Sequence, residues 1–186
     1  MHQAQERDEW LMAQVADGKR EHLEPLIRRY ANPLLTFIRR MVGDQHRSEE
    51  LFQDVFLAVW VKRRQYEFPR PFKSWLYAIA VNKCRASFRG QALPAFLAEA
   101  GNLATPPATR EPSPVEKMVA TETAALVANA VELLPPQQRA VVVLRVWDGL
   151  SYAEIAEIVG RSQGTVRSNM HHGLAAMRKY LEPRLE

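Results

Sequence analysis

The sequence predicts an all-α protein of two small helical domains, an N-terminal helical bundle and a C-terminal helix-turn-helix domain, joined by a Pro-rich linker. Almost every segment outside the linker places apolar residues three and four positions apart, which is helical rather than strand periodicity. The composition changes between Gly90 and Pro114, where five prolines stand among Ala, Thr and Asn. We therefore expect domains at 1–90 and 115–186, with a linker at 91–114.

The stretch from Leu150 to Tyr180 has the start and stop signals of two helices joined by a tight corner. Ser151 and Glu154 have the spacing of a capping box, Gly160 can end the first helix, and Ser162 can begin the second. The expected buried positions are Ala153, Ile155, Ala156 and Val159 in the first helix, and Val166, Met170, Leu174 and Met177 in the second. This pattern is a helix-turn-helix, whose second helix can enter a DNA major groove. Spacing alone fits an ordinary helical hairpin equally well.

Four helices are predicted in the N-terminal domain, at 6–16, 20–42, 47–63 and 73–89. Trp10 faces inward in the first of them. Pro33 is expected to kink or split the second helix, because proline lacks an N–H and clashes with the preceding turn. The apolar set of the third helix is wider than one stripe, so this helix either lies deep in the core or offers surface to a partner. In the C-terminal domain a helix is expected over 115–133, and another begins after Pro135 with Val146 in its core.

The composition is that of a soluble globular protein, and its mildly basic charge is compatible with nucleic-acid binding. The chain has 186 residues, a net charge of +4, 47% hydrophobic residues and 25% charged residues, as in soluble globular proteins. No apolar run approaches the roughly 20 residues that cross a bilayer, and the first residues do not resemble a secretory signal, so we expect a cytoplasmic protein without membrane insertion. Cys84 is the single cysteine, which fits a reducing compartment and a buried structural thiol.

No catalytic constellation is evident in the sequence. The five histidines have no cysteines or carboxylates at metal-ligand spacing, and there is neither a Gly-rich phosphate loop nor a serine elbow. We therefore expect no catalytic residues, no metal, no cofactor and no enzymatic activity.

Four segments together resemble the extracytoplasmic-function group of the sigma-70 family, the bacterial subunits that direct RNA polymerase to promoters. LIRRYANPLLTFIRRMVGD resembles the opening helices of the family, and SEELFQDVFLAVW resembles its polymerase-binding helix. FKSWLYAIAVNKCRASFR is similar to the promoter-melting helix, and ELLPPQQRAVVVLRVWDGLSYAEIAEIVGRSQGTVRS is similar to the region that reads the upstream promoter element. The segments occur in the family's order and cover most of the chain.

The resemblance implies partners for each domain. Region 2, at 1–90, is expected to bind core polymerase and to recognise and melt the downstream element. Region 4, at 115–186, is expected to read the upstream element. The polymerase contacts are the clamp of the largest subunit and the flap of the second-largest subunit. The residues implied for the clamp contact are Leu51, Gln53, Asp54, Phe56 and Trp60. The family also implies an inhibitory anti-sigma factor, around which the two domains can close.

In the promoter-melting segment, Asn82 falls at the position where the family holds a flipped base of the downstream element. An exposed amide can hydrogen-bond a splayed base edge, and neighbouring aromatic and basic groups can stack on it or hold its phosphates. The expected wall of this pocket is Tyr66, Phe68, Arg70 and Lys73, and the expected phosphate contacts are Lys83, Arg85 and Arg89. The alternative is an ordinary solvated helix face.

In the second helix of the helix-turn-helix, Arg167 and Ser168 match family positions that contact the upstream element, and Arg161 and Thr165 are placed to touch phosphate. Many relatives have arginines where this chain has Asn169 and His172, and His171 stands beside them. Asn favours a bidentate contact with adenine where Arg favours guanine, and neutral His adds little charge. We therefore expect an unusual base preference or weaker upstream binding.

These observations predict a sigma factor that directs promoter-specific initiation and leaves catalysis to the polymerase. Two other classes remain open. A stand-alone transcriptional regulator would bind duplex DNA without polymerase. A helical adaptor or anti-sigma mimic would bind proteins only, and would need neither Arg167 nor Asn82.

Overall fold

The computed structural model describes residues 7–88 and 115–185, and this part of the chain is helical with no strands. The N-terminal helices are α1 (Asp8–Ala16), α2 (Leu23–Val42), α3 (Gln45–Val61) and α4 (Phe72–Ser87), with 3-10 turns at Arg20–His22 and Arg63–Gln65. The C-terminal helices are α5 (Val115–Glu132), α6 (Pro136–Val146), α7 (Tyr152–Val159) and α8 (Gln163–Leu185). The all-α prediction is confirmed, whereas the predicted linker and Arg89 lie outside the described residues.

Helix ends follow the local chemistry of the sequence. The side chain of Asp44 accepts a hydrogen bond from the Arg47 N–H at 2.6 Å and caps α3, which starts two residues before its predicted first residue. The capping box at Ser151 and Glu154 is formed, and Gly160 ends α7 with φ of 64°. Of the two outcomes expected at Pro33, the split does not occur, because α2 runs through Pro33 as a single helix.

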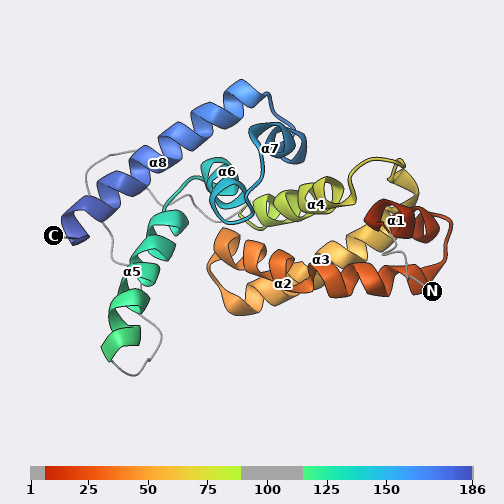
Figure 1. Ribbon diagram of the computed structural model, residues 1–186, viewed down its shortest axis with the longest axis horizontal. Helices are drawn as coiled ribbons and strands as arrows, with labels where there is room; N and C mark the ends of the chain where they lie inside the picture. Colours follow the sequence, from red (N-terminus) through yellow and green to blue (C-terminus); the bar gives the residue numbers. More distant parts are fainter. Residues whose placement is uncertain (1–6, 89–114, 186) are drawn as a thin grey trace.

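The N-terminal helices form a bundle, and the C-terminal helices lie beside it (Figure 1). In the bundle α3 packs on both α2 and α4, while α8 packs on α5, α6 and α7. The largest fully buried side chains include Phe37, Phe72 and Tyr77 in the bundle and Leu144 and Ile155 in the C-terminal helices. Four residues predicted to be buried are exposed: Trp10 at 41%, Val146 at 53%, Leu174 at 46%, and Ala153.

The position of Leu174 shows where the periodicity of α8 was misassigned. Its buried positions are Val166, Met170, Gly173 and Met177, so the buried stripe passes through the glycine and not through Leu174. A Cβ atom on Gly173 would stand only 2.8 Å from Cγ2 of Val142. The absent side chain is what lets α8 approach α6 closely. The exposed ring of Trp10 packs edge to face on the half-buried ring of His22, with the ring centroids 5.4 Å apart.

The N-terminal and C-terminal helices are joined through α4 against α7 and α2 against α6. We call the residues that connect them, Arg40, Tyr77, Arg139, Trp147 and Asp148, the junction. The Tyr77 hydroxyl donates to Oδ1 of Asp148 at 3.0 Å, and the Arg40 guanidinium lies 5.0 Å from the Trp147 ring centroid. Arg139 is buried, donates to the carbonyl oxygens of Met41, Glu132 and Leu134, and stacks near Phe88.

Because Arg139 on α6 satisfies the last carbonyl of α5 and a carbonyl of α2 together, it supports both halves of the chain.

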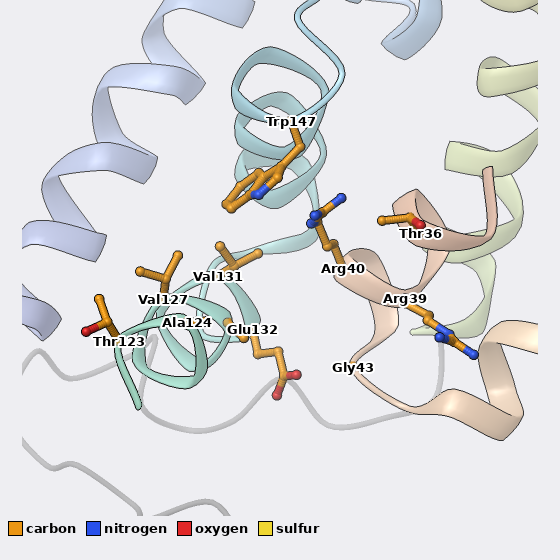
Figure 2. Close-up of a pocket in the computed structure, with 11 residues that line it drawn as sticks. Thr36, Arg39, Arg40, Gly43, Thr123, Ala124, Val127, Val131, Glu132 and Trp147 are labelled. Carbon is orange, nitrogen blue, oxygen red and sulfur yellow. The ribbon is translucent and has the colours of Figure 1, made fainter. Parts of the chain in front are cut away.

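Beside the junction a cavity of about 1010 Å³ opens between α2 and α5 (Figure 2). Its α5 wall is largely apolar, and its α2 wall carries Arg39 and Arg40. Arg40 turns to Trp147, while Arg39 reaches Glu49 of α3 at 3.6 Å.

Candidate nucleic-acid and protein interfaces

The exposed face of α3 combines apolar and polar side chains. Of the five residues predicted to contact polymerase, Gln53 and Asp54 are exposed and Trp60 is half-buried, whereas Leu51 and Phe56 are only 3% and 7% exposed. The latter two pack in the core of the bundle and are unsuitable as surface contacts in this conformation. Two apolar residues that were not singled out, Leu57 and Val61, are 61% and 66% exposed.

Residues 53, 57, 60 and 61 recur at intervals of three and four, so they share one side of α3. Exposed leucine and valine beside a half-buried tryptophan, with glutamine and aspartate at the edge, form the mixed surface typical of a protein interface. The helical spacing of Leu57 and Val61 from Gln53 could have identified them, since the whole helix is too apolar for its core-facing stripe alone. We call Gln53, Leu57, Trp60 and Val61 the α3 stripe.

Before α4, the loop at 66–71 has one buried and one exposed aromatic side chain. Tyr66, predicted as part of a base pocket, is 7% exposed: its ring lies 5.4 Å from that of Trp75, and its hydroxyl donates to the Arg70 carbonyl. Burial, followed by the charge of Glu9, raises the pKa of Tyr66 to about 12. Tyr66 therefore fixes the loop, and Phe68, at 62% exposure, is the aromatic surface that the loop presents.

Asn82 is exposed on α4, and its amide makes no hydrogen bond within the described part of the chain. Lys83 beside it donates to Oδ2 of Asp54 at 3.2 Å, so a predicted phosphate contact and a predicted polymerase contact form an ion pair. Lys73 is half-buried, with its Nζ 5.8 Å from the Tyr77 ring centroid. Arg70 is exposed.

Arg85 connects this surface to the helix-turn-helix. It is half-buried, and its Nε has no hydrogen-bond partner among the described residues. Burial, and then the positive charge of Arg161, lower the pKa of the Arg85 guanidinium. The structure thus brings together two predicted phosphate contacts, one from each half of the chain.

The helix-turn-helix consists of α7, the corner at Gly160 and α8. Ser162 caps α8: its Oγ accepts from the Thr165 N–H at 3.2 Å and lies 2.9 Å from Oγ1 of Thr165. Of the predicted upstream contacts, only Asn169 is half-buried. The others are all exposed: Arg161, Thr165, Arg167, Ser168, His171 and His172.

The predicted upstream contacts do not share one direction. At about 100° per residue, Arg167 and Asn169 point to opposite flanks of α8, and Ser168 and His171 lie between them on the outer side. The rings of His171 and His172 pack edge to face 5.6 Å apart. His172 also lines a cavity between α5 and α8, on the flank of Asn169.

The described residues contain no group of three or more His, Cys, Asp or Glu side chains placed to hold a metal ion. None of the helices in that part of the chain is long and apolar enough to span a membrane.

Two family models match the chain: sigma-70 region 2 over residues 26–93 and sigma-70 region 4 over residues 124–177. The ECF RNA polymerase sigma-E factor of Escherichia coli is 30% identical over 184 residues, with 95% of each chain covered. The chain belongs to the extracytoplasmic-function sigma factors. The ECF RNA polymerase sigma factor SigE of Mycolicibacterium smegmatis is 34% identical over 85% of this chain, which spans 61% of the length of that relative.

The fold of this sigma factor is similar to that of CnrH, solved in complex with the cytosolic domain of CnrY. The TM-score is 0.71 at 24% identity, and the match covers 95% of this chain and 97% of the other. Sigma factors are transcription initiation factors, so the family membership confirms the predicted class of function. The two region models lie on opposite sides of residues 94–123, in the order that the resemblance implied.

Proposed function

We propose that this sigma factor binds core RNA polymerase in the cytoplasm and reads a promoter with two separate surfaces. The helix-turn-helix carries the proposal: α8 presents Thr165, Arg167 and Ser168 on its exposed side, directly after a capped start, and the turn before it presents Arg161. This is the arrangement in which a recognition helix meets base edges and phosphates in a major groove. Upstream recognition is assigned to 115–186.

The second surface is proposed for the downstream element. Asn82 supplies an unoccupied amide for a flipped base, and exposed Phe68 supplies a stacking ring. Arg70, Lys73 and Arg85 supply positive charge for phosphates. Tyr66 supports this surface from inside. Lys83 can bind phosphate only when its ion pair with Asp54 opens. A surface ion pair of this kind contributes little to stability.

The α3 stripe is the proposed contact with the clamp of the largest polymerase subunit, and the C-terminal helices are the proposed contact with the flap of the second-largest subunit. Leu57 and Val61 replace Leu51 and Phe56 as the apolar anchors of the clamp contact, because only the first pair is exposed. Val61→Glu is expected to abolish co-migration with core polymerase without unfolding α3. Asn32→Glu, which adds the same charge at an exposed position of α2, is the matched control.

Transcription in vitro with purified core polymerase and a panel of promoters tests the whole proposal. A promoter-dependent transcript that requires this chain is the expected result, and Asn82→Ala and Arg167→Ala should each reduce it. The absence of any transcript, together with no co-migration with core, would overturn the proposal. Duplex binding of equal strength with and without core would indicate a stand-alone regulator instead.

We further propose control by an anti-sigma factor that binds between the two halves of the chain. Two observations support this. Two sigma factors of the same fold, CnrH and RpoE of Bartonella quintana, were solved with CnrY and with the anti-sigma factor NepR. In this chain, the cavity between α2 and α5 has an apolar wall opposite Arg39 and Arg40, which suits an amphipathic helix with acidic residues. Arg40→Glu is expected to weaken inhibition by a stoichiometric anti-sigma factor and leave uninhibited transcription unchanged.

A further inference from the structure

Tyr152 is the first residue of α7, and its ring lies against two guanidinium groups from different helices. The Arg145 Cζ, on α6, is 5.0 Å from the ring centroid, and the Arg167 Cζ, on α8, is 5.6 Å from it. Both distances are within the range in which a cation is attracted to an aromatic face. One ring therefore connects three helices of the C-terminal half.

The ring of Tyr152 is itself held in place. It is half-buried and packs against the hydrophobic core. Ser151 directly before it forms the capping box with Glu154, which fixes the backbone at the start of α7. The Arg145 side chain is anchored by a hydrogen bond of 2.8 Å from its Nη1 to the Leu150 carbonyl. Tyr152 is thus a fixed platform.

Arg167 differs, because its side chain is exposed and makes neither a hydrogen bond nor an ion pair among the described residues. The ring of Tyr152 is the directional contact that the structure gives it. A guanidinium that packs on a ring keeps its N–H groups free at its edge for acceptor atoms. A free arginine loses side-chain entropy when it binds, whereas one already held in position loses less.

We propose that Tyr152 is a positioning residue for Arg167: its ring holds the guanidinium in the direction in which it meets the upstream promoter element. Tyr152 does not need to touch DNA. This inference rests on the proposed role of Arg167 and adds a residue outside the recognition helix to the determinants of specificity. The competing explanation is that Tyr152 contributes only to the packing of α7.

A double-mutant cycle separates the two explanations, because a positioning role depends on Arg167 and a packing role does not. The assay uses full-length chain bound to core polymerase and measures affinity for upstream-element duplexes, selected from a randomised library with the unaltered chain. Tyr152→Leu is expected to weaken binding about three- to tenfold, the cost of ordering one free side chain. In an Arg167→Ala background the same substitution is expected to cause no further loss.

Two additional readouts distinguish positioning from folding. Tyr152→Phe keeps the ring and should restore near-normal affinity. Tyr152→Leu should broaden base preference at the position that Arg167 reads and leave the other positions unchanged. If Tyr152→Leu melts below the assay temperature, Tyr152→Met provides a longer apolar side chain without a ring for the same cycle.

An equal loss from Tyr152→Leu in both backgrounds would overturn the inference, and so would a loss from Tyr152→Phe as large as that from Tyr152→Leu. If Arg167→Ala weakens binding but Tyr152→Leu does not, this inference fails and the proposed function stands. If Arg167→Ala binds as tightly as the unaltered chain, the proposed role of Arg167 fails first.

Discussion

The side chains on α8 that are proposed to contact DNA were predicted from the sequence, but the directions in which they point came only from the structure. Asn169 is half-buried on one flank of the helix, and Arg167 is exposed on the other against Tyr152. The sequence identified these side chains as candidate contacts, because they fall at positions that match the family's contacts with the upstream element. The flanks depend on which stripe of α8 is buried, and that stripe was assigned through Leu174 instead of Gly173.

The first prediction concerns base preference. Asn pairs bidentately with adenine and Arg with guanine, so Asn169→Arg should shift preference from adenine to guanine at one position of the upstream element. A base-by-base substitution scan with the holoenzyme measures this. Ala125→Arg, which adds the same charge at an exposed position on α5, controls for nonspecific attraction. An unchanged preference in the Asn169→Arg protein would show that this flank does not read bases.

The second prediction follows from two buried acids that keep their protons in the fold. Burial raises the pKa of the Cys84 thiol from 9.0 to about 12 against the opposing charge of Arg139, and the pKa of Tyr66 rises from 10.0 to about 12. Because both folded values exceed the unfolded ones, their contribution to stability is complete below about pH 9 and is lost as pH rises toward about 12.

The free energy of unfolding should therefore fall between about pH 9 and about pH 12, measured by urea denaturation at each pH. Cys84→Ala removes the thiol and should flatten the part of this decline that begins near the unfolded value of 9.0. A decline of the same steepness in Cys84→Ala would assign the effect to other groups.

At the scale of helices, most of the fold could be read from the sequence. The capping box, the glycine corner and the helical periodicity are local signals, and the helices they predict are present. Local signals did not determine which residues are buried where a tertiary contact decides it. Gly173 is buried because α6 approaches it, and Leu51 and Phe56 are buried because α3 uses one side for the core. Local spacing does not encode which of two neighbouring stripes faces inward.

The third prediction compares two glycines of α8. Gly164→Ala meets only Ser162 Oγ at 3.7 Å, so it should stabilise the chain by up to about 1 kcal/mol through helix propensity. Gly173→Ala places its Cβ 2.8 Å from Val142 in a packed interface. Overpacking costs about 1–3 kcal/mol, which exceeds the gain in helix propensity, so Gly173→Ala should lower the free energy of unfolding. Urea denaturation of both variants measures the difference, and an equal rise in stability would show that α6 and α8 separate easily.

For the whole molecule, the contact between the two halves could not be predicted from the sequence. Arginine side chains are mostly exposed, yet Arg139 is buried and donates a hydrogen bond to the Met41 carbonyl, 98 positions away in the chain. Asp148 reads as the end of α6, yet it accepts a hydrogen bond from Tyr77. Such pairs follow from how the halves dock, which local propensity and capping do not determine.

The fourth prediction concerns the strength of the junction. Burial raises the pKa of Asp148 despite the opposing effects of Tyr77, Lys73 and Arg40, and its Oδ2 has no hydrogen-bond partner among the described residues. The carboxylate is therefore a costly group at this position. Asp148→Asn retains an oxygen to accept from Tyr77 and removes the charge, so it should favour the docked halves. Tyr77→Phe removes the donor and should disfavour them by about 1–3 kcal/mol.

The docked arrangement binds the proton of Asp148 more tightly than a separated one, in which this group titrates near its ordinary value of 3.8. Docking should therefore strengthen as pH falls through the raised pKa, and this pH dependence should vanish in Asp148→Asn. Small-angle scattering measures the radius of gyration across the same pH series. A smaller radius at low pH in the unaltered chain, a constant small radius in Asp148→Asn and a larger radius in Tyr77→Phe are expected. Equal radii in all three proteins at every pH would show that Asp148 does not control docking.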